Sequence, residues 1–163
     1  MARIDNKTAL VVGGAKGIGL AVAERLSAEG ATVFLTGRRD DEVKAAVLNL
    51  SGDVHGLVAD AGVPEDLERI VATVVEARGR LDYLVLNAGL SEPSTILDET
   101  PEHFDRHFGV NVRGMVYGLK AALPALARGS SVILMGSIAD GMGIPPYSCL
   151  LYTSPSPRDQ RGS

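Results

Sequence analysis

The sequence predicts an α/β fold in three layers, with helices on both faces of a doubly wound parallel sheet. Short apolar, β-branched segments alternate with helical patterns from residue 8 to residue 137. A glycine-rich turn joins the first strand pattern to the first helix pattern, as in parallel βαβ units. Parallel crossovers are right-handed, so helices are expected outside both faces of the sheet.

The first strand is predicted at residues 8–13, a β-branched apolar run of the kind that is buried on both faces of a sheet. The helix after it has apolar residues at helical spacing and a stop at Gly30. Residues 31–37 repeat the apolar character of the first strand and are predicted as the second. These elements form the first βαβ unit.

A charged helix is predicted from about residue 40 to residue 50, followed by a third strand at 54–60. Pro64 suits the first turn of the next helix, and two acidic residues follow it near the positive end of the helix dipole. Residues 81–87 form the fourth predicted strand. The alternation of strand and helix therefore continues through the first half of the chain.

The longest helical pattern covers residues 101–128, and a fifth strand is predicted at 130–136. The character of the sequence changes after Ser148, where the alternation should give another long helix. Residues 149–163 instead contain two prolines, no helical period and a polar end. We expect one domain over residues 1–148 and a tail at 149–163 that is not native to it.

Composition excludes several function classes. The 163 residues suit one domain, and 45% apolar with 22% charged residues is typical of a soluble globular protein. No stretch approaches the length of a membrane-spanning helix, so a cytoplasmic location without membrane association is expected. A net charge of −4 with scattered basic residues gives no reason to expect nucleic acid.

Metal and disulfide chemistry are not expected. Cys149 is the single cysteine, so neither a disulfide nor a thiolate metal site can form within the chain. His103 and His107 stand four apart and could share a helix face, but no third ligand is evident beside them. We interpret both histidines as surface or groove residues.

Three glycines between the first strand and first helix, Gly13, Gly17 and Gly19, indicate a dinucleotide-binding turn. A pyrophosphate needs backbone N–H groups at a helix N-terminus, and only glycine allows the backbone to come that close. A tight turn without ligand is the alternative, but the flanking strand and helix favour a Rossmann-type site.

Two cations favour NADP over NAD as the ligand. Arg38 lies nineteen residues after Gly19, at the end of the second strand, where a ribose-selecting residue is expected. A guanidinium there suits the 2′-phosphate of NADP, whereas an acidic residue would favour NAD. Lys16, in the glycine turn, could reach the same phosphate. NAD stays open as the alternative, with both cations simply solvated.

Five features occur in order along the chain: the turn from Gly13 to Gly19, Asp60, Asn87-Ala88-Gly89, Asn111 and Ser137. Together they resemble the ordered motifs of the short-chain dehydrogenase/reductase family over residues 2–148. The resemblance implies an NAD(P)-dependent oxidoreductase that transfers hydride between nicotinamide and a small-molecule ketone or secondary alcohol. It also implies a parent protein that is a homo-oligomer. With Lys16 and Arg38 included for the 2′-phosphate, the expected cofactor-binding residues are Gly13, Lys16, Gly17, Ile18, Gly19, Arg38, Asp60, Ala61, Asn87, Ala88 and Gly89.

The same resemblance assigns roles at the far side of the site. Asp60 and Ala61 resemble the pair beside the adenine, and Asn87-Ala88-Gly89 resembles the turn that backs the cofactor. Asn111 resembles the catalytic asparagine that holds a water in a proton relay. Ser137 resembles the serine that hydrogen-bonds the substrate carbonyl. The alternative for Asn87-Ala88-Gly89 is a simple turn. The alternatives for Asn111 and Ser137 are a polar helix residue and a strand-end cap.

The family's catalytic tyrosine and lysine are missing at the expected spacing. Thirteen residues after Ser137 stands Leu150, and four further stands Ser154. Tyr147 and Tyr152 are poor substitutes, since no lysine follows Lys120. We expect a truncated, inactive chain whose tail resembles translated sequencing adapter joined to a gene fragment. A non-catalytic dinucleotide-binding module is the alternative. A Rossmann-like methyltransferase would need an acidic residue at the end of the second strand to hold ribose hydroxyls, and Arg38 at that position argues against it.

Overall fold

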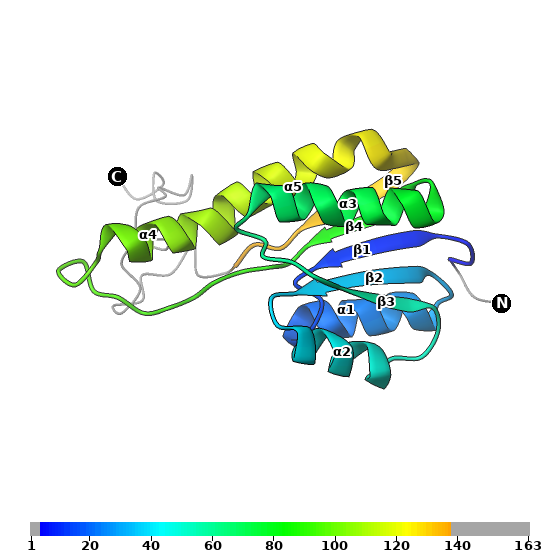
Figure 1. Cartoon of the computed structure of the whole chain (residues 1–163), viewed down its shortest axis with the longest axis horizontal. Helices are drawn as coiled ribbons and strands as arrows, with labels where there is room; N and C mark the ends of the chain where they lie inside the picture. Colours follow the sequence, from blue (N-terminus) through cyan, green and yellow to red (C-terminus); the bar gives the residue numbers. More distant parts are fainter. Residues whose placement is uncertain (1–3, 138–163) are drawn as a thin grey trace, which may run out of the picture.

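The computed structural model describes residues 4–137 and has the expected α/β architecture (Figure 1). Its strands are β1 (Thr8–Val12), β2 (Thr32–Gly37), β3 (Val54–Val58), β4 (Leu81–Leu86) and β5 (Leu126–Leu134). Its helices are α1 (Gly17–Ala28), α2 (Asp40–Asn49), α3 (Pro64–Arg78), α4 (Pro101–Phe108) and α5 (Gly114–Ala122). The predicted boundary at 148–149, with Leu150 and Ser154, lies outside the described residues.

The sheet is parallel throughout its described strands, in the order β3-β2-β1-β4-β5. The chain runs outward from β1 to β2 and β3, then returns to place β4 on the other side of β1. The connection after β1 leads to β2 on one side, and the connection after β4 leads to β5 on the other side. Because these two connections diverge, a crevice opens between the carboxyl ends of β1 and β4. This arrangement confirms the predicted doubly wound fold.

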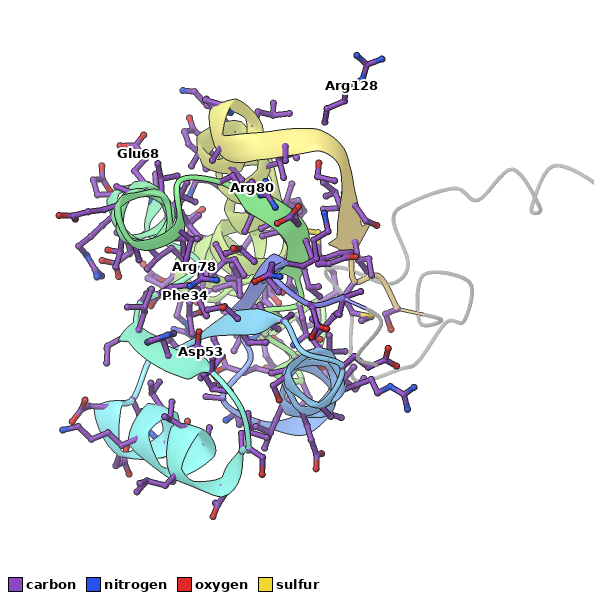
Figure 2. The ribbon with its side chains drawn as sticks, turned by 90° about the vertical axis from the view of Figure 1, so that its right-hand side faces the viewer. Phe34, Asp53, Glu68, Arg78, Arg80 and Arg128 are labelled. Carbon is purple, nitrogen blue, oxygen red and sulfur yellow. The ribbon has the colours of Figure 1, made fainter. Side chains whose placement is uncertain are left out.

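Alternate residues of β1 pack against opposite helix layers. Leu10 and Val12 belong to a core with residues of α3 and α5, whereas Ala9 and Val11 pack with residues of α1 and α2. All four side chains are buried. Figure 2 shows α1 and α3 nearly end-on, on opposite sides of the sheet. Burial on both faces explains the unbroken apolar strand patterns in the sequence.

The long helix predicted at 101–128 is interrupted and ends early. A π-helical turn, Gly109–Arg113, separates α4 from α5, and a 3-10 turn at Leu123–Ala125 leads directly into β5. Pro124 cannot donate a backbone hydrogen bond, so the α-helical ladder stops there. Leu126 instead pairs with Leu81 of β4. Within residues 4–137, no helix is long and apolar enough to span a bilayer.

A buried carboxylate fixes the start of β1 to β4. Asp82 accepts a hydrogen bond from the backbone N–H of Thr8 (3.0 Å) and pairs with Lys7 Nζ (3.0 Å) and Arg80 Nε (3.3 Å). Burial opposes ionisation of Asp82, but the hydrogen bond and the two cations outweigh it and hold its pKa below the ordinary value. Asp82 therefore stays charged in the folded protein at neutral pH.

Candidate functional site

A cavity of about 470 Å³ opens at the carboxyl ends of β1, β2, β3 and β4. This is the crevice that the reversal of strand order creates. It brings together segments that lie far apart in the sequence. Its lining residues are Gly13, Ala15, Lys16, Thr36, Gly37, Arg38, Arg39, Glu42, Ala59, Asp60, Ala61, Asn87, Ala88, Gly89, Leu90 and Val110.

The glycine turn at the floor of this cavity is tightly held. The backbone N–H of Gly13 donates to Thr36 Oγ1 (3.1 Å), and Asn87 Nδ2 donates to the Gly13 carbonyl (2.9 Å). A Cβ atom on Gly19 would lie 2.2 Å from that carbonyl oxygen, which only glycine avoids. A Cβ atom on Gly17 would instead meet nothing within 4 Å. Open space therefore lies beside Gly17.

The N-terminus of α1 follows this turn. Lys16 is the N-cap residue, and its own side chain makes no capping hydrogen bond to the first turn of the helix. The N–H groups there are available to an anion, and the helix dipole favours negative charge at the same place. Ile18, in this turn, is 63% exposed. Gly17, Ile18 and Gly19 form the first turn of α1 but do not line the cavity itself.

Three basic residues line one end of the cavity. Lys16 and Arg38, both expected from the sequence, are joined there by Arg39, with Glu42 of α2 among them. The Glu42 carboxylate forms an ion pair with Arg39 Nη2, and the same oxygen lies 3.7 Å from Lys16 Nζ. Sequence reasoning missed Arg39 and Glu42, because the fold is needed to bring α2 against the glycine turn.

The turn after β3 places Asp60 and Ala61 in the cavity wall. Asp60 Oδ1 accepts from the backbone N–H of Gly62 (2.8 Å), and the backbone N–H of Asp60 donates to Asp66 Oδ2 (2.8 Å). That backbone hydrogen bond and Arg69 lower the pKa of Asp66. The turn is thus fixed from two sides, and Ala61 is buried within it.

Asn111 lies in the π-helical turn and holds the chain after β4 in place through two hydrogen bonds to Leu90. Its Oδ1 accepts from the backbone N–H of Leu90 (2.8 Å), and its Nδ2 donates to the Leu90 carbonyl (2.8 Å). π-Helical turns occur often at functional sites. Neither Asn111 nor the exposed Ser137, which follows β5, lines the cavity. The structure therefore gathers most of the expected cofactor residues in the cavity lining and places Asn111 against that lining at Leu90, whereas Ser137 is not among the lining residues.

His107, one helical turn before Asn111, also holds the chain after β4 in place. Its buried ring accepts from the backbone N–H of Glu92 at Nε2 (3.0 Å) and bonds the His103 carbonyl through Nδ1 (2.9 Å). Nδ1 is thus the protonated nitrogen. Ligand atoms of Glu92, His103 and His107 lie within 4.8 Å of one another. The expectation that no third group lies near the two histidines is wrong, because the loop before α4 folds back over them. The interpretation of His107 as a surface or groove residue is also wrong, because its ring is buried and hydrogen-bonded to this loop.

We expect His107→Leu to loosen this loop. The Glu92 N–H and the His103 carbonyl would lose their partner, which lowers the free energy of unfolding by about 1–2 kcal/mol. Amide exchange at Glu92 should accelerate at least tenfold, measured by mass spectrometry or NMR. His55→Leu, at an exposed histidine outside the loop, is the matched control. Unchanged exchange at Glu92 would show that His107 does not hold the loop.

Known proteins resemble this chain in both sequence and fold. Residues 7–153 match the family model described as short chain dehydrogenase. The oxidoreductase asL5 of Sarocladium schorii is 38% identical over 148 residues, covering 90% of this chain and 59% of that protein. Human dehydrogenase/reductase SDR family member 4 is 38% identical over 154 residues, covering 89% and 55%. The chain thus spans little more than half the length of these relatives.

Solved structures share the fold. A short-chain dehydrogenase/reductase from Brucella melitensis, described as a glucose/ribitol dehydrogenase, superposes with a TM-score of 0.86 at 30% identity, covering 90% of this chain and 63% of that one. A doubly substituted variant of a Serratia marcescens short-chain dehydrogenase/reductase gives a TM-score of 0.82 at 31% identity, covering 91% and 62%. Both resemblances extend across nearly the whole of this chain.

Proposed function

The chain belongs to the short-chain dehydrogenase family, and from this premise we propose that its cavity binds a nicotinamide dinucleotide, with NADP preferred to NAD. The observation that carries the proposal is the open space beside Gly17 at the N-terminus of α1. A pyrophosphate there would meet backbone N–H groups and the positive end of the helix dipole. The residues present therefore fit this group.

The preference for NADP rests on charge at the end of β2. Lys16, Arg38 and Arg39 line the cavity beside Thr36 and Gly37. A 2′-phosphate carries close to two negative charges and forms strong charge-assisted hydrogen bonds with guanidinium groups. NAD has only a hydroxyl at this position, so it gains little from these cations. Asp60 and Ala61 are proposed to flank the adenine, as the family resemblance implies.

The proposed reaction class is hydride transfer to or from a small-molecule ketone or secondary alcohol. The bound coenzyme would supply or accept the hydride. In the whole protein, Ser137 is proposed to donate a hydrogen bond to the substrate oxygen. Asn111 is proposed to take part in a water-mediated proton relay. Asn87 supports the floor of the site by its hydrogen bond to the Gly13 carbonyl.

A non-catalytic dinucleotide-binding module is the second candidate. Leu150 and Ser154 stand where the family spacing calls for a proton-transferring tyrosine and its supporting lysine. Without those groups the chain is proposed to bind coenzyme without turnover. An NADPH-oxidation assay with small ketones tests this directly, because consumption of NADPH by the chain would contradict binding without turnover. A cytoplasmic location, homo-oligomerisation of the parent and a non-native tail at 149–163 remain predictions.

Titration with NADPH and NADH tests the coenzyme assignment. The chain should bind NADPH at least tenfold more tightly, and Arg38→Gln should remove about tenfold of that affinity, the effect of one charge-assisted hydrogen bond. Affinity for NADH should stay within twofold. Arg25→Gln, on the exposed face of α1, is the matched control. Tighter binding of NADH would contradict the preference, and binding of neither would contradict the proposed function.

A further inference from the structure

Glu42 is an acidic side chain inside the cationic end of the cavity. It belongs to the first turn of α2, and its side chain is only 23% exposed. The following residue, Val43, is buried against β2 and fixes the helix in place. The helix N-terminus also favours a carboxylate in this turn. Glu42 is therefore held among the cations rather than extended freely into solvent.

A single carboxylate oxygen of Glu42 contacts cations from two separate elements. Oε1 pairs with Arg39 Nη2, at the N-cap of α2, and lies 3.7 Å from Lys16 Nζ, at the N-cap of α1. An oxygen of a phosphate group would satisfy the same two cations in the same way. The Glu42 carboxylate thus occupies the electrostatic position that an anionic ligand would take.

From this arrangement we infer that Glu42 is a specificity-determining residue that competes internally with the 2′-phosphate and limits the preference for NADP. The inference rests on the proposed function. Binding of NADP brings a phosphate against Glu42, so the carboxylate must give up its cations or tolerate a like charge. NAD places only a hydroxyl there and leaves the Glu42 ion pairs intact. Glu42 therefore weakens binding of NADP selectively.

Glu42→Gln tests this inference in the full chain. The amide keeps the size of the side chain and its hydrogen-bond acceptor, but removes the negative charge. Affinity for NADPH should rise about tenfold, while affinity for NADH should change less than twofold. Adenosine 2′,5′-bisphosphate and 5′-AMP, used as separate probes, should reproduce the same contrast. The gain for NADPH should shrink as salt rises from about 50 to about 300 mM, because salt screens exposed charges.

Asp40→Asn is the matched control. It removes the same charge from the same helical turn, but Asp40 pairs with Lys44 and does not line the cavity. Both affinities should change less than twofold in this variant. Thermal melts of both variants check that α2 remains folded.

The outcomes separate the inference from the proposed function. An unchanged ratio of NADPH to NADH affinity in Glu42→Gln would overturn the inference and leave coenzyme binding intact. Weaker NADPH binding would also overturn it, because Glu42 would then serve to order the cations for the phosphate. Binding of neither coenzyme to the unsubstituted chain would overturn both proposals.

Discussion

Gly19→Ala is expected to abolish coenzyme binding and to lower the free energy of unfolding by about 3 kcal/mol, a large cost for one methyl group. The new Cβ would lie 2.2 Å from the Gly13 carbonyl oxygen and 2.6 Å from Asn87 Nδ2. The nearer of these atoms is backbone and cannot rotate away. The turn must move, which separates Asn87 from Gly13 and displaces the N-terminus of α1. Urea unfolding and NADPH titration measure the two effects.

Gly79→Ala provides the matched control for this prediction. Gly79 ends α3 with φ +76°, and a Cβ there meets no atom within 4 Å. The substitution should cost only about 1 kcal/mol, the strain of a left-handed conformation, and leave coenzyme affinity unchanged. Equal losses in the two variants would mean that contact with Gly13 does not set the cost.

Asp82→Ala is expected to destabilise the protein by about 2–3 kcal/mol at neutral pH. The change leaves the buried N–H of Thr8 without its acceptor and leaves Lys7 and Arg80 without their anion. Asp82→Asn should cost less, because an amide oxygen can still accept from Thr8. Asp105→Ala, at an exposed position on α4, is the control and should change stability by less than about 0.5 kcal/mol.

The contribution of Asp82 should disappear in acid. Its pKa in the folded protein lies below the ordinary value of 3.8, so folding favours the ionised form. The resulting stabilisation is complete above that ordinary value and is lost as pH falls through the lower, folded-state pKa. The stability difference between the unsubstituted chain and Asp82→Asn should therefore narrow from about pH 7 to about pH 2. Parallel curves across that range in urea unfolding would contradict the assignment.

Local patterns in the sequence were sufficient for most of the fold. Strands buried on both faces give unbroken apolar runs, and residues 81–87 and 31–37 were correctly predicted for that reason. The interruption of the helix pattern at 101–128 was not predicted. A π-helical turn adds no distinctive residue, and the switch at Leu126 depends on pairing with Leu81 of β4. The spacing of apolar residues within one segment does not show which distant segment it will pair with.

The candidate site was predicted only where a motif lies within one segment. Gly13, Lys16 and Arg38 were found from their spacing along one βαβ unit, and they do line the cavity. Glu42 was missed because a carboxylate in a first helical turn usually serves the helix dipole alone. The bond between Glu92 and His107 was missed because it crosses an irregular loop. Such contacts follow from the tertiary fold rather than from any sequence period.

The hydrogen bond from Asn87 to the Gly13 carbonyl bears on how a ligand would be received. It joins the carboxyl ends of β1 and β4, between which the strand order reverses. The two sides of the cavity are therefore held in place before a ligand binds. Little ordering entropy is then lost on association. Loss of this hydrogen bond should consequently slow association of either coenzyme, because the turn would then have to be ordered as the ligand binds.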